Sequence, residues 1–300
     1  MKILIIEPPA VSKYGNQRIF GGNGSNKSEF RKPPLDLIMI SGYLKKSGFD
    51  NDLLDANASG KNIEDVKKII ESQHPDIIFF STSTCTIYKD LLIAMAAKEV
   101  NPSIVTVAIG THVMALTEET FQESQYLDII VYSSEWEQAS LNIVRNLSNL
   151  ENAKGIFFKK PDGTIVKTDL QPPLQNLDDL GFPSHDKLEK ELYGDPTSKG
   201  SPKTMVMGQK ACINNCSFCC QPAFFGAPVI RKRSVEHFIS ELKWVQHLGF
   251  KEVMFNDATL TADTEWATAL FEGMIENNID ITWNCSTRAE RVNDSVLKLM

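Results

Sequence analysis

The sequence lacks the long apolar runs that membrane-spanning and secreted proteins need. The apolar run at its N-terminus, Ile3–Ile6, is only four residues long, whereas the core of a secretory signal peptide needs about 7 to 15. No segment approaches the roughly 18 uninterrupted apolar residues of a membrane-spanning helix. We therefore expect no membrane span and a cytoplasmic location.

Positive charge is also scarce. Lys and Arg number 31 against 38 Asp and Glu, which leaves a net charge of -7. A protein that coats nucleic acid needs a basic surface, so no nucleic-acid partner is expected. The one dense basic run, Arg231–Arg233, is interpreted as a solvated start of a helix. Internal repeats and low-complexity segments are absent as well.

Cysteine is scarce too, but four of the six cysteines stand in one segment, ACINNCSFCC, as Cys212, Cys216, Cys219 and Cys220. In a reducing compartment, clustered thiols indicate metal binding or catalysis rather than disulfides. The C-x3-C-x2-C spacing lets one short loop give three thiolates to a cubane iron–sulfur cluster, whose fourth iron stays open. Structural zinc with Cys220 as a fourth ligand, or no metal at all, remains an alternative. Cys85 and Cys285 are expected to be small buried residues.

What the sequence has in plenty is alternation of apolar strands with amphipathic helices. This pattern favours an α/β fold whose first domain, residues 1–150, is a doubly wound parallel sheet. Strands are predicted at 2–9, 49–57, 75–82, 103–110 and 127–132, and helices at 33–48, 61–73, 88–100, 116–124 and 134–147. Ligands of such sheets bind beyond the carboxyl ends of the strands.

Residues 151–200 have a different pattern and are predicted to form a hairpin and a linker. Asp162–Gly163 is the turn of the hairpin, and residues 171–196 are rich in Pro and Asp. Alternation resumes in residues 201–300, which are predicted to form part of a β/α barrel. Strands are predicted there at 203–210, 251–258 and 280–287, and helices at 234–249, 263–278 and 293–300.

The segment CINNCSFC resembles the radical S-adenosylmethionine (SAM) signature C-x3-C-x-aromatic-C, with Phe218 at the aromatic position. Several further segments are similar to the N-terminal half of cobalamin (B12)-binding radical SAM proteins: RKPPLDLIMISGYLKKSGF, VAIGTHV, DIIVYSSEWE, LDDLGFPSHD, RKRSVEHFISELKWVQHLGFKEVMFNDATLT and WNCSTRAERVN. The similarity covers nearly the whole chain. It implies a Rossmann-like B12-binding domain followed by a partial, TIM-like radical SAM barrel.

This resemblance implies which residues bind the iron–sulfur cluster and SAM. Cys212, Cys216 and Cys219 would hold a [4Fe-4S] cluster whose open iron chelates SAM and cleaves it reductively. The resemblance further implies SAM contacts for residues beside the cluster and at two strand ends. Phe218 would pack near the adenine, Asn256 and Asp257 would meet the methionyl amine, and Ser286 and Arg288 would follow the third strand, with Arg288 pairing with the methionyl carboxylate. No catalytic residue is assigned.

The resemblance implies a less typical cobalamin site. The D-x-H-x-x-G pattern that supplies a lower histidine ligand is absent, so cobalamin would bind base-off, and His112 is not expected to ligate cobalt. The segment 133–137, SSEWE, keeps both carboxylates of the family's G-E-G-E but neither glycine, so Ser133 and Trp136 are expected to crowd the corrin tail. The residues expected to line the tail are Thr82, Ser83, Thr84, Gly110 and Thr111.

The sequence ends in the third β/α unit after the cysteine loop, whereas a radical SAM core has six, so a fragment or a truncated gene product is expected. The activity implied is methylation of an unactivated carbon. The alternatives are oxidative cyclisation, carbon rearrangement, or corrinoid or metal binding without turnover. A small-molecule substrate (a lipid, a tetrapyrrole or a natural-product intermediate) and an electron donor such as flavodoxin or ferredoxin are the expected partners.

Overall fold

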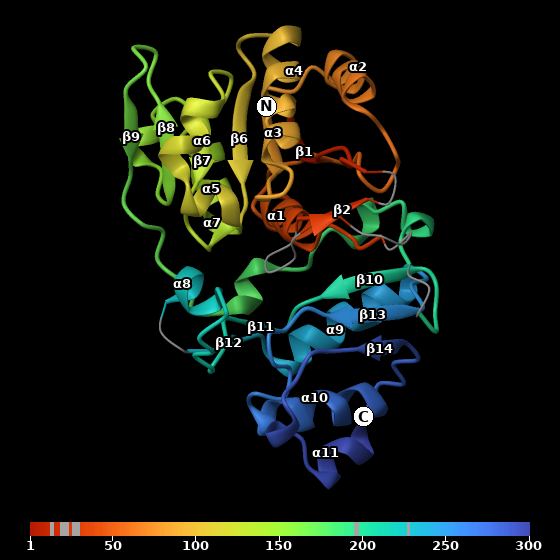
Figure 1. Cartoon of the computed structure of the whole chain (residues 1–300). Helices are drawn as coiled ribbons and strands as arrows, with labels where there is room; N and C mark the ends of the chain where they lie inside the picture. Colours follow the sequence, from red (N-terminus) through yellow and green to blue (C-terminus); the bar gives the residue numbers. More distant parts are fainter. Residues whose placement is uncertain (13–14, 19–23, 26–30, 195–197, 227–228) are drawn as a thin grey trace. The chain divides into compact units, whose positions relative to one another are not determined.

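The apolar segments of the first half form one sheet. The computed structural model describes residues 1–12, 15–18, 24–25, 31–194, 198–226 and 229–300, and Figure 1 shows the whole chain. Strands β4, β1, β5, β6 and β7 run parallel in that order, and β8 and β9 extend the sheet in antiparallel fashion. The strands are β1 (Ile3–Glu7), β4 (Asp52–Asp55), β5 (Ile77–Ser81), β6 (Val105–Ile109), β7 (Ile129–Val131), β8 (Ile156–Lys159) and β9 (Ile165–Lys167).

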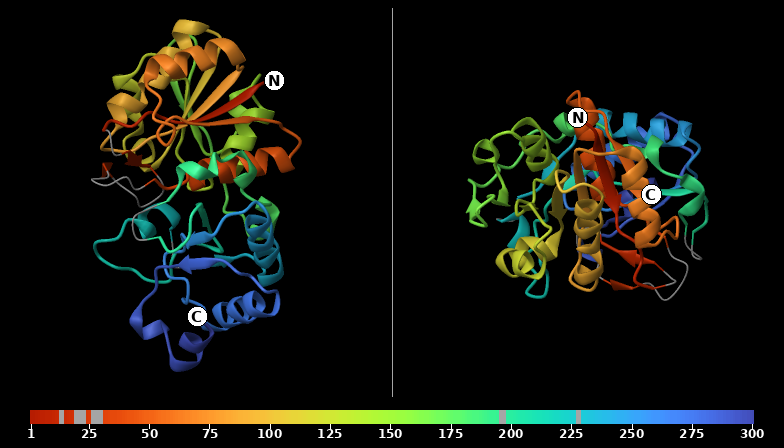
Figure 2. Two further views of the ribbon diagram at one scale, coloured as in Figure 1. Left: turned by 90° about the vertical axis from the view of Figure 1, so that its right-hand side faces the viewer. Right: turned by 90° about the horizontal axis from the view of Figure 1, so that it is seen from above.

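Helices cover both faces of this sheet (Figures 1 and 2). Successive strand residues point to opposite faces, so Ile3 and Ile5 join the core under α1 and α7, and Leu4 and Ile6 join the core under α2 and α4. The helices and 3-10 turns are α1 (Leu35–Lys46), α2 (Ile63–Gln73), α3 (Ile87–Asp90), α4 (Leu92–Val100), α5 (Thr111–Ala115), α6 (Thr117–Glu123), α7 (Trp136–Arg145), η1 (Leu150–Asn152) and η3 (His185–Lys187). The doubly wound parallel sheet predicted from the sequence is thereby confirmed.

Some local details differ from the prediction. The helix predicted at 88–100 is broken at Leu91 into α3 and α4, and α5 was not predicted, because Gly110–Ala115 is too short to show a helical period. A small antiparallel pair, β2 (Asn16–Gln17) and β3 (Gly24–Ser25), follows β1. The hairpin predicted around Asp162–Gly163 forms β8 and β9.

Part of the predicted linker packs onto α1. The Ser184 amide donates to the Ile38 carbonyl at 2.8 Å, and Lys45 Nζ donates to the Asp186 carboxylate at 3.0 Å. A Cβ on Gly42 would come within 2.0 Å of the Phe182 carbonyl oxygen, so only glycine allows this approach. By its contacts the chain divides into two units, one of residues 1–174 with 182–188 and one of residues 175–181 with 189–300.

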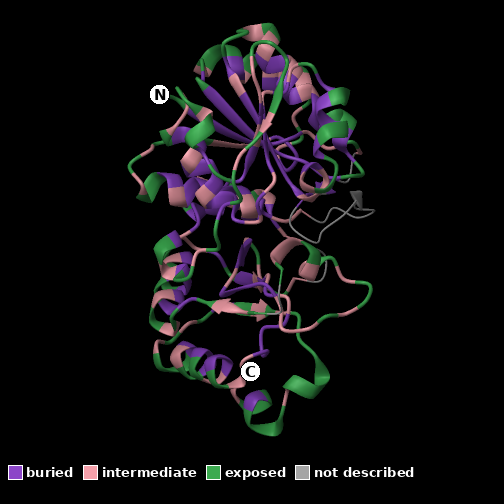
Figure 3. Cartoon of the chain, turned by 90° about the vertical axis from the view of Figure 1, so that its left-hand side faces the viewer, coloured by how far each residue is buried: buried purple, intermediate pink, exposed green. Residues whose placement is uncertain are grey.

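The second unit is built on three parallel strands in the order β10-β13-β14. All four residues of β10 are buried, and the second unit's helices carry both buried and exposed residues (Figure 3). Its strands are β10 (Lys203–Val206), β11 (Gln209–Lys210), β12 (Arg231–Lys232), β13 (Glu252–Phe255) and β14 (Thr282–Asn284). Its helices and 3-10 turns are α8 (Gln221–Phe225), α9 (Val235–His247), α10 (Thr264–Glu276), α11 (Asp294–Leu299), η2 (Leu177–Leu180), η4 (Lys190–Leu192) and η5 (Ala289–Arg291). These β/α repeats are the partial barrel predicted from the sequence.

Two interpretations of the second unit need correction. The strand predicted at 203–210 bends after Val206, because β11 leaves the sheet to pair with β12. Arg233 is not solvated: its guanidinium is buried, pairs with Glu241 and lies 4.9 Å from the centre of the Phe238 ring. In the described part of the chain, no helix is both long and apolar enough to cross a membrane.

Candidate functional site

The cysteine loop lies at the edge of the second unit where its parallel strands end. It follows β10 and β11, and its residues contact the segments that follow β13 and β14. Cys212 Sγ lies 3.7 Å from Thr259 Oγ1, and Cys216 Sγ lies 3.5 Å from Arg288 Nη1. Segments from three strand ends therefore meet at this loop, as expected for parallel strands.

Three thiols of this loop, those of Cys212, Cys216 and Cys219, are free and only partly exposed. None of the six cysteines of the chain forms a disulfide. The Cys212 sulfur accepts from the amide of Asn214 at 3.4 Å and from its Nδ2 at 3.5 Å, and the Cys219 amide donates to the Cys216 carbonyl at 3.0 Å. Thiolates are the form in which cysteines ligate iron. The three cysteines are the right residue types for a three-thiolate site. Among the described residues, however, no three His, Cys, Asp or Glu side chains lie close enough together to hold a metal ion.

Cys220 differs from its three neighbours. It is exposed, whereas the other three are partly buried, and it occupies the N-cap position of α8. Cys85 is exposed and Cys285 is only half-buried, so the expectation that both are buried is wrong for Cys85. Cys85 lies in a surface loop where it packs against no core.

The residues predicted to contact SAM are spread over this edge. Phe218 is 91% exposed, and Ser286 is exposed, with its carbonyl accepting from the Leu260 amide at 2.9 Å. Asn256 is half-buried, and its amide donates to the Val206 carbonyl at 2.8 Å. Arg288 is exposed and pairs with Glu290, and this pairing is the main reason why its pKa is raised.

Asp257 is the buried acid of this edge. Its Oδ2 accepts from the Gly208 amide at 3.3 Å, and its Oδ1 has no hydrogen-bond partner in the described part of the chain. Burial raises the pKa of Asp257 to about 7, although backbone donors and the charge of Arg233 oppose the shift. A buried carboxyl oxygen without a donor is unfavourable unless a proton or a ligand satisfies it.

In the first unit, the residues predicted to line the cobalamin tail fall into two groups. Thr82 and Ser83 are buried and used internally: Thr82 Oγ1 donates to the Ile109 carbonyl at 2.9 Å, and the Ser83 amide donates to Asp90 Oδ2 at 3.1 Å. Thr84 is exposed, and Thr111 is half-buried. Thr84 Oγ1 also lies 3.1 Å from Nδ1 of His112, whose pKa is lowered chiefly by burial.

Gly110 has a packing role at the same edge. Its φ of 142° lies in the region that favours glycine, and a Cβ there would come within 2.3 Å of the Thr82 carbonyl oxygen. In the segment 133–137, Trp136 is buried in the core beside α1 and its Nε1 donates to Met114 Sδ at 3.3 Å. Glu135 and Ser133 are buried as well.

Sequence reasoning missed a buried charge network at the ends of β1 and β5. Arg18 donates from Nη1 to Glu7 at 3.0 Å and from Nε to Asp90 at 3.0 Å. Ser81 donates to Glu7, and Thr86 Oγ1 donates to Asp90 at 2.5 Å. The network lies where strand order reverses between β1 and β5, the place where open α/β sheets bind ligands. The only local signal is Glu7, an acid that directly follows an apolar strand.

Sequence reasoning also missed the residues that contact the cysteine loop from other segments. Thr259 Oγ1 lies 3.5 Å from Asn214 Nδ2, and Thr261 and Thr287 share a hydroxyl–hydroxyl hydrogen bond. Thr259 and Thr261 follow β13 in the sequence ATLT, and Thr287 follows β14. Their position at a strand end was a signal, but no spacing rule connects them with Cys212.

Comparisons with known proteins agree with this arrangement of segments. Residues 25–139 match the B12 binding domain family. An uncharacterised methyltransferase of Pyrococcus horikoshii is 31% identical over 303 aligned residues, which cover 100% of this chain and 62% of that protein. The anaerobic magnesium-protoporphyrin IX monomethyl ester cyclase of Rubrivivax gelatinosus is 31% identical over 268 residues, covering 85% of this chain and 47% of that protein. The chain thus spans only 47% to 62% of the length of these relatives.

A solved structure shows the same fold. It is the cobalamin-dependent S-adenosylmethionine radical enzyme OxsB with aqua-cobalamin and S-adenosylmethionine bound. The TM-score is 0.77 at 16% sequence identity, over 99% of this chain and 41% of that one. At this identity the likeness concerns the fold.

Proposed function

We propose, on the premise that this chain belongs to the cobalamin (B12)-binding radical SAM family, that it is the N-terminal part of a B12-dependent radical SAM enzyme. The enzyme would cleave SAM reductively at a [4Fe-4S] cluster and methylate an unactivated carbon of a small molecule. Residues 1–150 would hold cobalamin, residues 151–200 would connect, and residues 201–300 would form the N-terminal half of the radical SAM barrel.

The observation that carries this proposal is the position of the cysteine loop. Three free thiols spaced as C-x3-C-x2-C stand at the carboxyl edge of a parallel sheet, with donors aimed at two of them. Cys212, Cys216 and Cys219 would hold the cluster. When bound, the cluster supplies the electron that cleaves SAM, and cobalamin supplies the methyl group.

The surrounding residues would bind and orient SAM. Arg288 carries the positive charge that would pair with the methionyl carboxylate of SAM. In the structure, its guanidinium pairs with Glu290. Asp257 Oδ1, which lacks a donor in the described residues, would accept from the methionyl amine. Asn256 would contribute its amide from the same strand end. The exposed ring of Phe218 would cover the adenine and exclude water.

The first unit would hold the cobalamin tail at the ends of β5 and β6. Thr84 and Thr111 reach the surface there, so their hydroxyls would donate to the tail. Thr82, Ser83 and Gly110 would shape this edge through the internal contacts described above. Because the side chain of Trp136 is packed in the core, its indole would not block the cobalamin tail at this edge.

Anaerobic reconstitution with iron and sulfide tests the cluster. We expect about four irons per chain, as a [4Fe-4S] cluster requires, and loss of the cluster in the Cys216→Ser variant. Cys220→Ser is the matched control, since Cys220 is exposed and outside the motif, and it should keep the iron content and the electron paramagnetic resonance signal of the wild type. Zinc in place of iron, or iron loss in Cys220→Ser alone, would refute the assignment.

Product analysis of the full-length protein tests the reaction. Formation of S-adenosylhomocysteine together with 5'-deoxyadenosine supports methylation, whereas 5'-deoxyadenosine alone without added product mass favours a second candidate, oxidative cyclisation. This second candidate is supported by the R. gelatinosus relative, which is named as a cyclase. If SAM is not cleaved under a strong reductant, the remaining alternative is a protein that binds corrinoid or metal without turnover.

The cluster requires a one-electron donor of the flavodoxin or ferredoxin type. A cytoplasmic location is proposed because clustered cysteines are kept reduced in such a compartment. A lipid, a tetrapyrrole or a natural-product intermediate remains the substrate class proposed.

A further inference from the structure

The first unit contains an open pocket on the side of the sheet covered by α2 and α4. Its volume is about 580 Å³, within the range of small-molecule sites. Its walls are the loop after β1, the connection from β4 to α2, and the junction of α3 and α4. None of the residues predicted to line the cobalamin tail lines this pocket.

Buried hydrogen bonds hold the pocket walls in place. Arg18 donates to the carbonyls of Pro8 at 3.0 Å and Pro9 at 2.9 Å, so a buried guanidinium anchors the first wall. The Asn16 amide donates to Asn57 Oδ1 at 2.9 Å, and Asn57 Nδ2 donates to the Asn16 carbonyl at 3.0 Å. This reciprocal pair ties the loop after β1 to the connection before α2. A pocket braced in this way loses little entropy when it binds a ligand.

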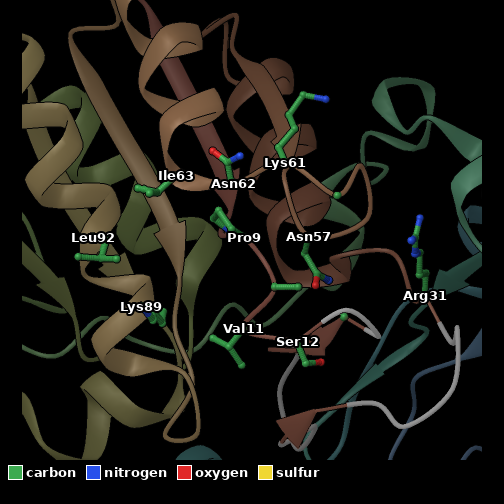
Figure 4. Close-up of a pocket in the computed structure, with 13 residues that line it drawn as sticks. Pro9, Val11, Ser12, Arg31, Asn57, Lys61, Asn62, Ile63, Lys89 and Leu92 are labelled. Carbon is green, nitrogen blue, oxygen red and sulfur yellow. The ribbon is translucent and has the colours of Figure 1, made fainter.

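The charge of the pocket is opposite to that of the chain. Among the described residues, the lining includes Arg31, Lys61 and Lys89 and no acidic residue, although the chain carries a net charge of -7. Within the described residues, neither Lys61 nor Lys89 has a side-chain hydrogen bond or ion pair, whereas Arg31 Nη1 donates to the Ala58 carbonyl at 2.6 Å. In Figure 4, Lys61 and Arg31 stand on one side and Lys89 on the other.

Apolar side chains lie between these cations. Pro9 and Val11 appear between the two sides in Figure 4, and Ile63 and Leu92 add aliphatic surface. The N-terminus of α2 is not the binding element, because the Asn62 side chain accepts from the amides of Glu64 and Asp65 and so caps the helix itself. An anion in the pocket would therefore be held by side-chain cations, with its apolar body on the aliphatic surface.

We propose that this pocket binds an organic anion that carries a phosphate or carboxylate group on an aromatic or aliphatic body. Lys61 and Lys89 would pair with the anion from opposite sides, and Val11, Ile63 and Leu92 would contact its body. No residue assigned to iron, SAM or cobalamin lines this pocket, so we expect the anion to bind with or without iron and cobalamin.

Methyl nuclear magnetic resonance of the full chain tests the site. Phenyl phosphate and benzoate are the two anionic probes, and benzyl alcohol is the neutral one. We expect the anions to shift the methyl signals of Val11, Ile63 and Leu92 in a saturable way, and benzyl alcohol to bind at least about tenfold more weakly. The probe that binds more tightly, phenyl phosphate or benzoate, identifies whether the site prefers a phosphate or a carboxylate group.

The variant Lys61→Gln/Lys89→Gln should weaken binding of the preferred anion by about tenfold, as expected for the loss of two partly exposed charge contacts. Lys68→Gln is the matched control, since Lys68 is exposed on α2 and outside the pocket lining. Unshifted methyl signals with every anion, binding unchanged in the double variant, or equal weakening in Lys68→Gln would each overturn the proposal.

Discussion

At the residue scale, the buried network around Arg18 determines how the first unit responds to pH. The pKa of Asp90 is raised from 3.8 to about 6, chiefly because burial penalises its charged form, although Arg18 and Thr86 oppose the shift. Two buried carboxylates share a single guanidinium in this network. Burial therefore outweighs the attraction of Arg18, and Asp90 holds a proton more tightly in the folded than in the unfolded chain.

The first prediction follows from the sign of this shift. Because the folded state binds the proton more tightly, the free energy of unfolding falls as the pH rises from about 4 to about 6, by about 3 kcal/mol from this group. In Asp90→Asn this pH dependence disappears, and urea unfolding at several pH values measures it. Glu71→Gln, which removes an exposed carboxylate on α2, should keep the wild-type profile. Parallel profiles for Asp90→Asn and the wild type would contradict the prediction.

A second prediction at this scale concerns Gly110. In Gly110→Ala, the new methyl group would meet the Thr82 carbonyl oxygen at 2.3 Å with an unfavourable φ, so we expect destabilisation by roughly 3 kcal/mol or more. Gly60→Ala also has a positive φ but nothing within 4 Å, and it should cost only about 1 kcal/mol. Denaturant unfolding compares the two. Equal losses would mean that the close approach to Thr82 is unimportant.

At the element scale, α1 serves as the docking surface for a segment far along the chain. Ser41 donates to Ser184 Oγ at 2.8 Å and to Asn51 Oδ1 at 2.7 Å, while Lys187 Nζ also reaches Asn51 Oδ1 at 2.8 Å. The segment 182–188 therefore covers this helix through buried polar contacts. The segment 182–188 can pack closely against α1 because Gly42 has no side chain at the contact with Phe182.

The third prediction uses the opposing effects of alanine at Gly42. Helix propensity alone would make Gly42→Ala stabilising by about 1 kcal/mol. The new Cβ, however, would meet the Phe182 carbonyl oxygen at 2.0 Å, so we expect the variant to be less stable than the wild type. Hydrogen exchange of the Ser184 amide should accelerate, because its bond to Ile38 weakens. A stabilised variant with unchanged Ser184 exchange would show that the segment does not depend on this contact.

At the scale of the whole molecule, the two units do not follow the order of the sequence. Residues 175–181 belong to the second unit, although the chain then returns to the first with residues 182–188. The first unit is therefore complete only when the chain extends to Leu188, which is itself buried.

The fourth prediction compares two fragments. A fragment ending at Leu188 should unfold cooperatively and be more stable, by on the order of 3 kcal/mol, than one ending at Leu174, since the longer fragment buries Leu188 and keeps the Ser41–Ser184 hydrogen bond. Urea unfolding followed by circular dichroism measures the difference. Equal stability would mean that residues 182–188 contribute nothing to the first unit.

Much of the fold was predictable from local patterns. The apolar strand Ile77–Ser81 has no polar alternation and proved buried on both faces, and α9 begins at its predicted cap, Ser234, whose hydroxyl accepts from the His237 amide. Residues such as Thr82 and Ser83 were correctly placed at a strand end. Whether their side chains face a ligand or the protein interior depends on neighbours far away in the chain, and both are buried.

The sequence by itself determined the properties that depend on neighbouring residues: the helical and strand periods, the turn at Asp162–Gly163, and the spacing of Cys212, Cys216 and Cys219 on one loop. Only the tertiary structure decided the contacts between distant residues. Arg18 and Asp90 are 72 positions apart, and Arg288 and Cys216 are also 72 apart. Such pairs leave no period or spacing in the sequence, because the packing of strands and helices alone brings them together.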